Sequence, residues 1–144
     1  MAQPSKLIQE AFDIQEATAN DSDKTITLNG KRDCQILGVR VLYDASATSA
    51  TRQLIVEFQD PDGNVIYEAR AGDTQTANEK FIYQFAVGVA DMTTAGRTDG
   101  TRVFLTTPIP PVAMRKNGII RVYDADATAV ASDDLTISVL AAWS

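Results

Sequence analysis

Short runs in which apolar and polar residues alternate occupy most of the chain from residue 25 to residue 143. Successive side chains of a β-strand point to opposite faces of its sheet, so this alternation predicts strands with one buried face. The runs cover residues 25–28, 37–43, 54–58, 65–67, 81–87, 103–105, 120–122 and 135–143. About eight short strands separated by turns are typical of an all-β sandwich of two antiparallel sheets.

The phase of the alternation predicts which side chains fill the space between the sheets. These are Val39, Val41, Leu54, Val56, Phe58, Phe81, Tyr83, Phe85, Ile137 and Val139, and Leu37 lies in the same phase as Val39. Apolar residues in the opposite phase are Ile36, Leu42, Ile55, Ile82 and Ile119. Large apolar patches are rarely left in water, so we expect loops or another chain to cover this second set.

Turn residues separate the runs. Residues 60–64, Asp-Pro-Asp-Gly-Asn, predict a tight hairpin, because Pro61 presets the backbone angle of a type I turn and Gly63 tolerates the left-handed conformation that follows. Residues 29–30, Asn-Gly, are a second hairpin candidate. Residues 108–111 are rich in proline, which cannot donate within a central strand, and we interpret them as a rigid crossover between the sheets. Polar or small-residue loops are expected over residues 45–50, 72–78, 90–100 and 125–133.

The N-terminal segment has a different pattern. Its apolar residues are Leu7, Ile8, Ala11, Phe12 and Ile14, and they fit one face of a short amphipathic helix. Phe12 and Ile14 also alternate, so an extended arm fits equally well. We therefore divide the chain into an N-terminal arm or short helix over residues 1–20 and a β-sandwich domain over residues 21–144.

Composition narrows the class of protein. The length of 144 residues favours one domain with a core that needs no disulfides. We expect no membrane span and no signal-peptide export, because the apolar runs are short and the first residues lack a signal pattern. We therefore expect synthesis in a cytoplasm. The net charge of −6 and the scattered arginines argue against nucleic-acid binding and suit solubility or a basic protein partner.

The chain is poor in catalytic side chains. It contains no histidine, which excludes a Ser-His-Asp triad, a Cys-His pair and an imidazole metal site. Its single cysteine, Cys34, forms no intrachain disulfide, and we interpret it as a small buried residue at the start of a strand. No Gly-rich loop leads into a helix, which argues against phosphate binding. We expect neither enzymatic activity nor a cofactor.

Acidic residues gather at three places: Asp60, Asp62 and Asn64; Asp124 and Asp126; Asp133 and Asp134. Calcium takes oxygen ligands at such spacing, but none of these clusters matches an EF-hand loop. We interpret the first as turn chemistry and the others as solvated loop caps, with calcium as the alternative. A sugar-binding sandwich would present exposed aromatic side chains, whereas the single tryptophan, Trp143, lies in phase with the core.

Two arginines border apolar strands. Arg52 and Arg121 are expected at exposed strand positions next to loops. The alternative is that they anchor a protein interface, since arginine is enriched at such interfaces.

Four stretches resemble small structural proteins of tailed phages. They are residues 38–43 with 50–57, residues 60–66, residues 106–111, and residues 118–124 with 133–137. The order of these elements is similar to the family pattern over most of the chain from Cys34 to Trp143. Each motif alone is a pattern that strands and turns of many β-proteins share. The resemblance transfers no catalytic residue.

The resemblance implies a jelly-roll-like sandwich in the virion. Proteins of this kind serve as capsid decoration or cement proteins, commonly as trimers, on the capsid surface. The implied partner is the phage major capsid protein, and the candidate contact residues are Leu7, Ile8, Phe12, Ile14, Arg52 and Arg121. The alternatives are a neck or tail component, or a host-adhesion component with a carbohydrate-binding sandwich.

Overall fold

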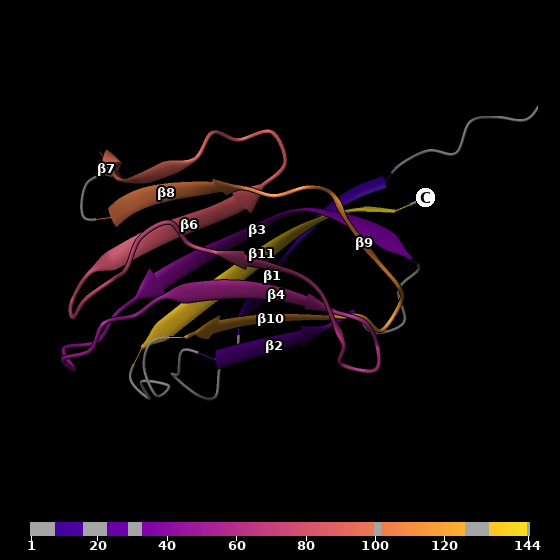
Figure 1. Cartoon of the computed structure of the whole chain (residues 1–144), viewed down its shortest axis with the longest axis horizontal. Coiled ribbons are helices and arrows are strands. Elements are labelled where there is room, and N and C mark those ends of the chain that lie inside the picture. The colour runs from indigo at the N-terminus through magenta and orange to yellow at the C-terminus, as the bar shows by residue number, and fades with distance from the viewer. Residues whose placement is uncertain (1–7, 16–22, 29–32, 100–101, 126–132, 144) are drawn as a thin grey trace, which may run out of the picture.

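The computed structural model describes residues 8–15, 23–28, 33–99, 102–125 and 133–143, and all regular elements in these ranges are strands (Figure 1). The strands are β1 (Ile8–Gln15), β2 (Asp23–Thr27), β3 (Cys34–Asp44), β4 (Leu54–Gln59), β5 (Val65–Arg70), β6 (Lys80–Ala86), β7 (Met92–Asp99), β8 (Arg102–Pro108), β9 (Val112–Met114), β10 (Ile119–Asp124) and β11 (Asp134–Trp143). The predicted all-β fold is confirmed. These residues include no helix long and apolar enough to cross a membrane.

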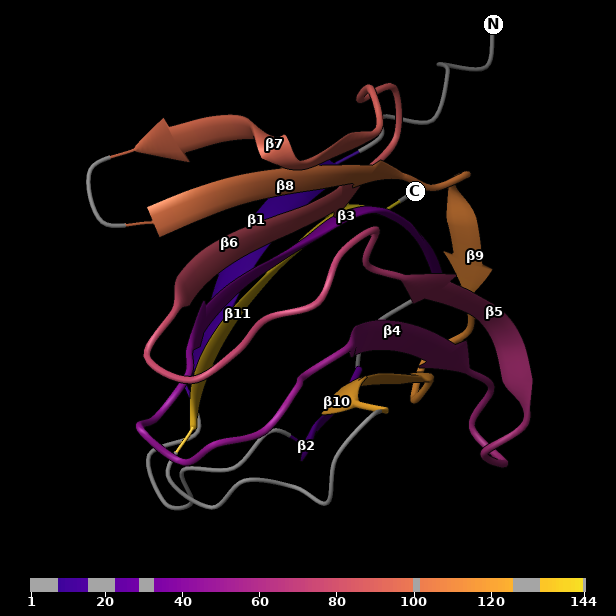
Figure 2. The ribbon, with the colours of Figure 1, turned by 60° about the vertical axis from the view of Figure 1, so that its left-hand side comes forward.

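The strands form two sheets that face one another (Figure 2). The larger sheet has the order β1-β11-β3-β6-β8-β7, with β9 also paired to β3, and the smaller has the order β2-β10-β4-β5. Neighbouring strands are antiparallel except β6 and β8, which are parallel. The predicted two-sheet, mainly antiparallel sandwich is therefore confirmed.

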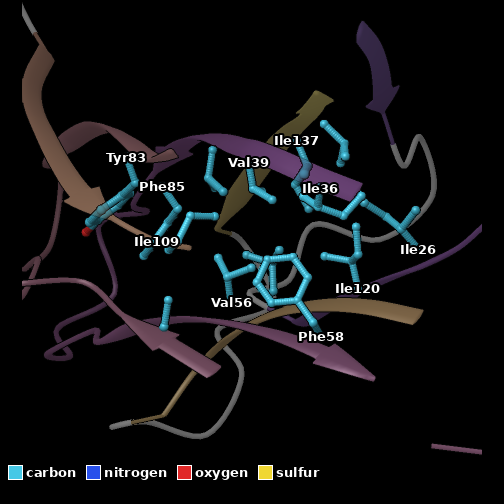
Figure 3. Close-up of a cluster of buried hydrophobic side chains, with 14 of the residues drawn as sticks. Ile26, Ile36, Val39, Val56, Phe58, Tyr83, Phe85, Ile109, Ile120 and Ile137 are labelled. Atoms are coloured by element: carbon cyan, nitrogen blue, oxygen red, sulfur yellow. The ribbon is translucent and has the colours of Figure 1, made fainter. Parts of the chain in front are cut away.

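Side chains from both sheets fill the space between them. The ten predicted core residues are each at most 2% exposed. Figure 3 shows Val39 and Ile137 of the larger sheet approaching Val56, Phe58 and Ile120 of the smaller sheet. Burial of a large apolar side chain contributes about 1.5–3 kcal/mol, so this layer is the main source of stability.

A β-bulge changes the phase of β3. Gly38 lies opposite Leu140 of β11, whereas Ile36 lies opposite Ala141, so Leu37 is an extra residue in the ladder. The bulge buries Ile36 and leaves Leu37 only partly buried. The assignment of Leu37 to the core phase was therefore wrong, because alternation assumes an unbroken ladder.

Two further expectations are corrected. The loop predicted over residues 90–100 contains β7, which forms by pairing with β8. Residues 109–111 link β8 to β9 within the larger sheet, so the predicted crossover between sheets is wrong for this segment. The Ile109 amide donates to the carbonyl of Ala86, which holds the segment against β6. In this part of the chain the change of sheet comes later, between β9 and β10.

The N-terminal segment is extended where it is described. β1 pairs antiparallel with β11, from Ile8 opposite Trp143 to Gln15 opposite Thr136. The helical alternative is wrong for residues 8–15, because these residues supply ladder partners to β11, whose edge would otherwise be open. Leu7 and the candidate hairpin at residues 29–30 lie outside the described residues.

Candidate interaction surfaces

Arg52 and Asp133 form an ion pair in the interior. Both side chains are at most 1% exposed, and Arg52 Nε donates to Asp133 Oδ2 at 2.6 Å. Arg52 Nη2 donates to the other carboxylate oxygen at 3.0 Å, which makes the pair bidentate. The guanidinium also donates to the carbonyls of Ala50 and Thr48. The pair therefore ties the loop after β3 to the start of β11.

Both carboxylate oxygens of Asp133 accept hydrogen bonds from protein donors. It accepts hydrogen bonds from the Tyr43 hydroxyl at 2.7 Å and from the Ser46 amide at 2.8 Å. Burial alone would raise the pKa of Asp133, but the hydrogen bonds from Arg52, Ser46 and Tyr43 lower it below its usual value. Asp133 also raises the pKa of Arg52 through their hydrogen bond. Both groups are thus held in their charged forms.

Gln75 extends this network toward β6. The backbones of Arg52 and Gln75 form an isolated antiparallel bridge with two hydrogen bonds. Gln75 Nε2 donates to the carbonyl of Tyr43, and the Tyr83 hydroxyl donates to Gln75 Oε1 at 2.9 Å. Gln75 is fully buried. The result is a buried polar cluster that joins three loops.

The expectation that Arg52 is an exposed strand residue or an interface anchor is wrong. Its guanidinium is buried by the network, so it offers no surface to a partner. Sequence reasoning missed Asp133 as its ion-pair partner, because the two lie 81 positions apart and Asp133 follows a polar segment. A long-range pairing of this kind leaves no local pattern.

Arg121 remains at the surface of the smaller sheet. It is partly buried, and its guanidinium carbon lies 4.0 Å from the ring centroid of Tyr123. Arg121 lies opposite Glu57 and Tyr123 lies opposite Ile55 in the ladder of β10 with β4, so these residues share the outer face. Burial and a hydrogen bond to Glu57 raise the pKa of Tyr123. Ile55 also belongs to this face and is only 1% exposed. A role for Arg121 in partner binding stays a prediction.

The larger sheet carries an apolar hollow of about 590 Å³ on its outer face. Two rows of residues in register across β11, β3 and β6 form its floor: Leu140, Gly38 and Ala86, and then Ser138, Arg40 and Gln84. The floor is low because Gly38 has no side chain and Ala86 has only a methyl group.

Apolar side chains surround this floor. Leu37, displaced outward by the bulge, lines the hollow, as do Val87 and Val89. Val87 is 40% exposed and Leu140 is 38% exposed. Among the described residues of the lining, Arg40 is the charged one. We call this set of residues the outer hollow; it fits an apolar side chain of a partner with a carboxylate beside it.

The residues of the predicted N-terminal contact belong to the same sheet. Ile8, Phe12 and Ile14 take their ladder positions in β1 opposite Trp143, Val139 and Ile137. Their backbone therefore pairs with the chain's own sandwich. A contribution of these residues to a partner contact stays a prediction.

The acidic cluster at residues 60–64 is confirmed as turn chemistry. Asp60 accepts hydrogen bonds from the amides of Asp62 and Asn64, and these bonds lower its pKa, with Asn64 contributing most. Gly63 has φ of 89°. Asp124 and Asp133 are buried, so the interpretation of these two residues as solvated loop caps is wrong. Asp124 accepts a hydrogen bond from the Gln53 amide, and Asp126 lies outside the described residues. The described residues contain no group of three acidic or cysteine side chains placed to hold a metal ion.

Cys34 is buried, as predicted. Its side chain is 7% exposed, and burial together with the charge of Asp33 raises its pKa to about 11. A thiol is a nucleophile only as the thiolate, so the environment makes Cys34 unreactive at neutral pH.

No protein-family model and no curated protein matches the chain. A solved structure with some likeness is a chain from the structure of infectious bursal disease virus Gx strain, with a TM-score of 0.41 and 11% identical residues. The match covers 92% of this chain and 33% of that chain, so this chain spans about a third of its length. A TM-score below 0.5 does not establish a shared fold.

Proposed function

We propose that this chain is a non-enzymatic structural protein of a virion, of the decoration or cement kind, that binds the subunits of the capsid shell. The observation that carries the proposal is the outer hollow, an apolar surface that a partner subunit would cover. The resemblance of four stretches to small tailed-phage structural proteins indicates the class of partner. Adhesion is then the whole activity, and it needs no catalytic group.

The outer hollow suits a protein partner. Exposed apolar patches with a charged residue at their margin are typical of protein contacts, in which a few buried anchors supply most of the binding energy. Arg40 would pair with a carboxylate of the shell subunit while Leu140 and Val87 lose their contact with water. The described residues of the lining include no aromatic side chain, and aromatic faces are the surfaces that bind sugars. The hollow therefore favours the shell-binding role over carbohydrate binding.

The location in the virion is tested on particles produced from the genome that encodes this chain. We expect mass spectrometry to detect the chain in purified particles, and electron cryomicroscopy to show it as a regular density on the capsid. Its absence from purified particles would contradict the proposal. Regular density only at the neck or tail would overturn the decoration role and support the alternative position.

The binding surface is tested by substitution. Leu140→Asp places a charge in the outer hollow, and we expect it to reduce binding to particles that lack this protein by at least about tenfold, since a central apolar anchor contributes about 2 kcal/mol or more. Thr25→Asp is the matched control, because Thr25 is an exposed strand residue of the smaller sheet. Equal binding of both variants, with unchanged circular dichroism, would rule out the outer hollow as the contact.

A further inference from the structure

β5 is an edge strand of the smaller sheet. It pairs with β4 on one side, and no described strand pairs with its other side. Figure 2 shows β5 at the right-hand margin of the molecule. Four of its six residues are exposed, and Val65 and Ile66 are 55% and 49% exposed. An exposed edge offers its unpaired amides and carbonyls to another strand.

The hydrogen bonds to β4 show which backbone groups of β5 face outward. The Ala71 amide donates to the Leu54 carbonyl, and Arg70 lies opposite Ile55 in the same register. The direction of backbone groups alternates along an antiparallel strand, so the groups of Ala69 and Ala71 face β4. Those of Glu68 and Arg70 therefore face away from β4, toward solvent.

The charges on this edge are self-complementary. Glu68 and Arg70 are both exposed and lie two positions apart, on the same face of β5. Neither makes an ion pair with another described residue. In an antiparallel pairing of two β5 strands centred on Ala69, Glu68 of each copy lies directly opposite Arg70 of the other. The same pair is then made twice, as a two-fold axis requires.

We propose that two copies of this chain associate through their β5 edges, in the antiparallel register centred on Ala69, so that the two smaller sheets become one continuous sheet. The outward amides and carbonyls of Glu68 and Arg70 supply the ladder hydrogen bonds, and the two Glu68–Arg70 pairs fix the register. This two-fold contact lies on the sheet opposite to the outer hollow. It is therefore independent of the proposed capsid binding and of the trimer that the resemblance implies.

Charge selects this register over its neighbours. A pairing centred on Glu68 brings the two Glu68 carboxylates together, and like charges directly opposite are destabilising. A pairing centred on Tyr67 places Ile66 opposite Glu68. Charged residues on an edge strand otherwise serve to prevent pairing. The charges of β5 differ from those of a protected edge. They repel in the register centred on Glu68 and attract in the register centred on Ala69.

Charge reversal tests the pairing by sedimentation velocity over a range of concentrations. Glu68→Arg and Arg70→Glu each place like charges opposite one another twice, and we expect each to weaken dimerisation by roughly tenfold or more. The double variant restores both pairs with reversed polarity and should dimerise like the wild type. Lys80→Glu is the control, because Lys80 is an exposed residue of the larger sheet.

Hydrogen exchange of the wild-type protein provides a second test that needs no variant. The amides of Glu68 and Arg70 should exchange rapidly at low concentration and become protected as the dimer forms, whereas those of Ala69 and Ala71 stay protected throughout. A wild type that remains monomeric at high concentration would overturn the proposal. A dimer that neither single charge reversal weakens, or whose Glu68 and Arg70 amides stay unprotected, would overturn it as well.

Discussion

Arg52 and Asp133 place two opposite charges in the interior, where each costs several kcal/mol of lost hydration. The cost is offset because every strong contact is present: two hydrogen bonds join the pair, Tyr43 and Ser46 donate to the carboxylate, and two carbonyls accept from the guanidinium. The contribution of the pair is to fix where β11 begins relative to the loop after β3. Removal of one partner is more damaging than removal of both, because a single buried charge is left uncompensated.

Arg52→Met tests this role. We expect the free energy of unfolding at neutral pH to fall by about 3–5 kcal/mol, because the Asp133 carboxylate loses its counter-charge in a buried site. The measurement is urea unfolding followed by tryptophan fluorescence and circular dichroism. In the double variant Arg52→Met with Asp133→Leu, much of the loss should be recovered. A single variant that loses less than about 1 kcal/mol would show that the pair contributes little.

Phe85→Ala tests the core at the same scale. Phe85 is 1% exposed between the sheets, so truncation leaves a cavity and should cost about 3–5 kcal/mol of unfolding free energy. Val87→Ala, two positions further and 40% exposed, is the control and should change stability by less than about 0.5 kcal/mol. Equal losses in urea unfolding would contradict the assignment of the inner face.

Residues of the core were predictable because burial is encoded locally. Val39, Val56 and Phe85 each lie in an alternating run whose phase gives the inner face. The pairing of Arg52 with Asp133 was not predictable, because it depends on which loops meet at the end of the sandwich. The bulge at Leu37 was not predictable either, since one inserted residue reverses the phase without a change in composition.

β1 shows how an element can depend on pairing rather than on its own pattern. Its sequence fits a helix as well as a strand, and the open edge of β11 decides between them. β7 is similar: its residues Met92–Asp99 include little apolar alternation, and the strand forms through its ladder with β8. Strands that contribute mainly hydrogen bonds to a sheet edge leave weak signals in the sequence, whereas central strands leave strong ones.

Deletion of residues 1–15 tests the contribution of β1. The deletion exposes the edge of β11 along eight register pairs, so we expect a lower melting temperature and a greater tendency to aggregate. Deletion of residues 1–7 alone is the control, because it leaves β1 intact. Thermal unfolding with light scattering provides both readouts. Identical melting temperatures for the two deletions would contradict the pairing of β1 with β11.

The whole molecule separates its surfaces by sheet. The outer hollow belongs to the larger sheet, and the β5 edge and the Arg121–Tyr123 pair belong to the smaller sheet. Strands from the two ends of the chain, β1 and β11, lie side by side in the larger sheet. The proposed contact with a shell subunit and the proposed contact with a second copy therefore use different sheets. The alternation in the sequence predicted the two layers. Which sheet carries the outer hollow and which carries the β5 edge depends on the strand order, which the alternation does not give.

We expect the stability of the fold to depend on pH through groups at both ends of the pH scale. The pKa of Asp133 is lowered from 3.8 in the folded state, so its contribution is present above that value and is lost as the pH falls through the folded-state pKa. The pKa of Cys34 is raised from 9.0 to about 11, so its contribution is present below pH 9.0 and is lost as the pH rises to about 11. Tyr83 acts in the same direction at higher pH, because burial raises its pKa.

Urea unfolding at a series of pH values should therefore show a plateau of stability between about pH 5 and pH 8, with a loss on each side. Cys34→Ala removes the thiol, so its alkaline loss between pH 9.0 and about 11 should be smaller than that of the wild type, whereas its acid loss should be unchanged. Alkaline losses of equal size in the two proteins would show that the Cys34 thiol titrates alike in the folded and unfolded states.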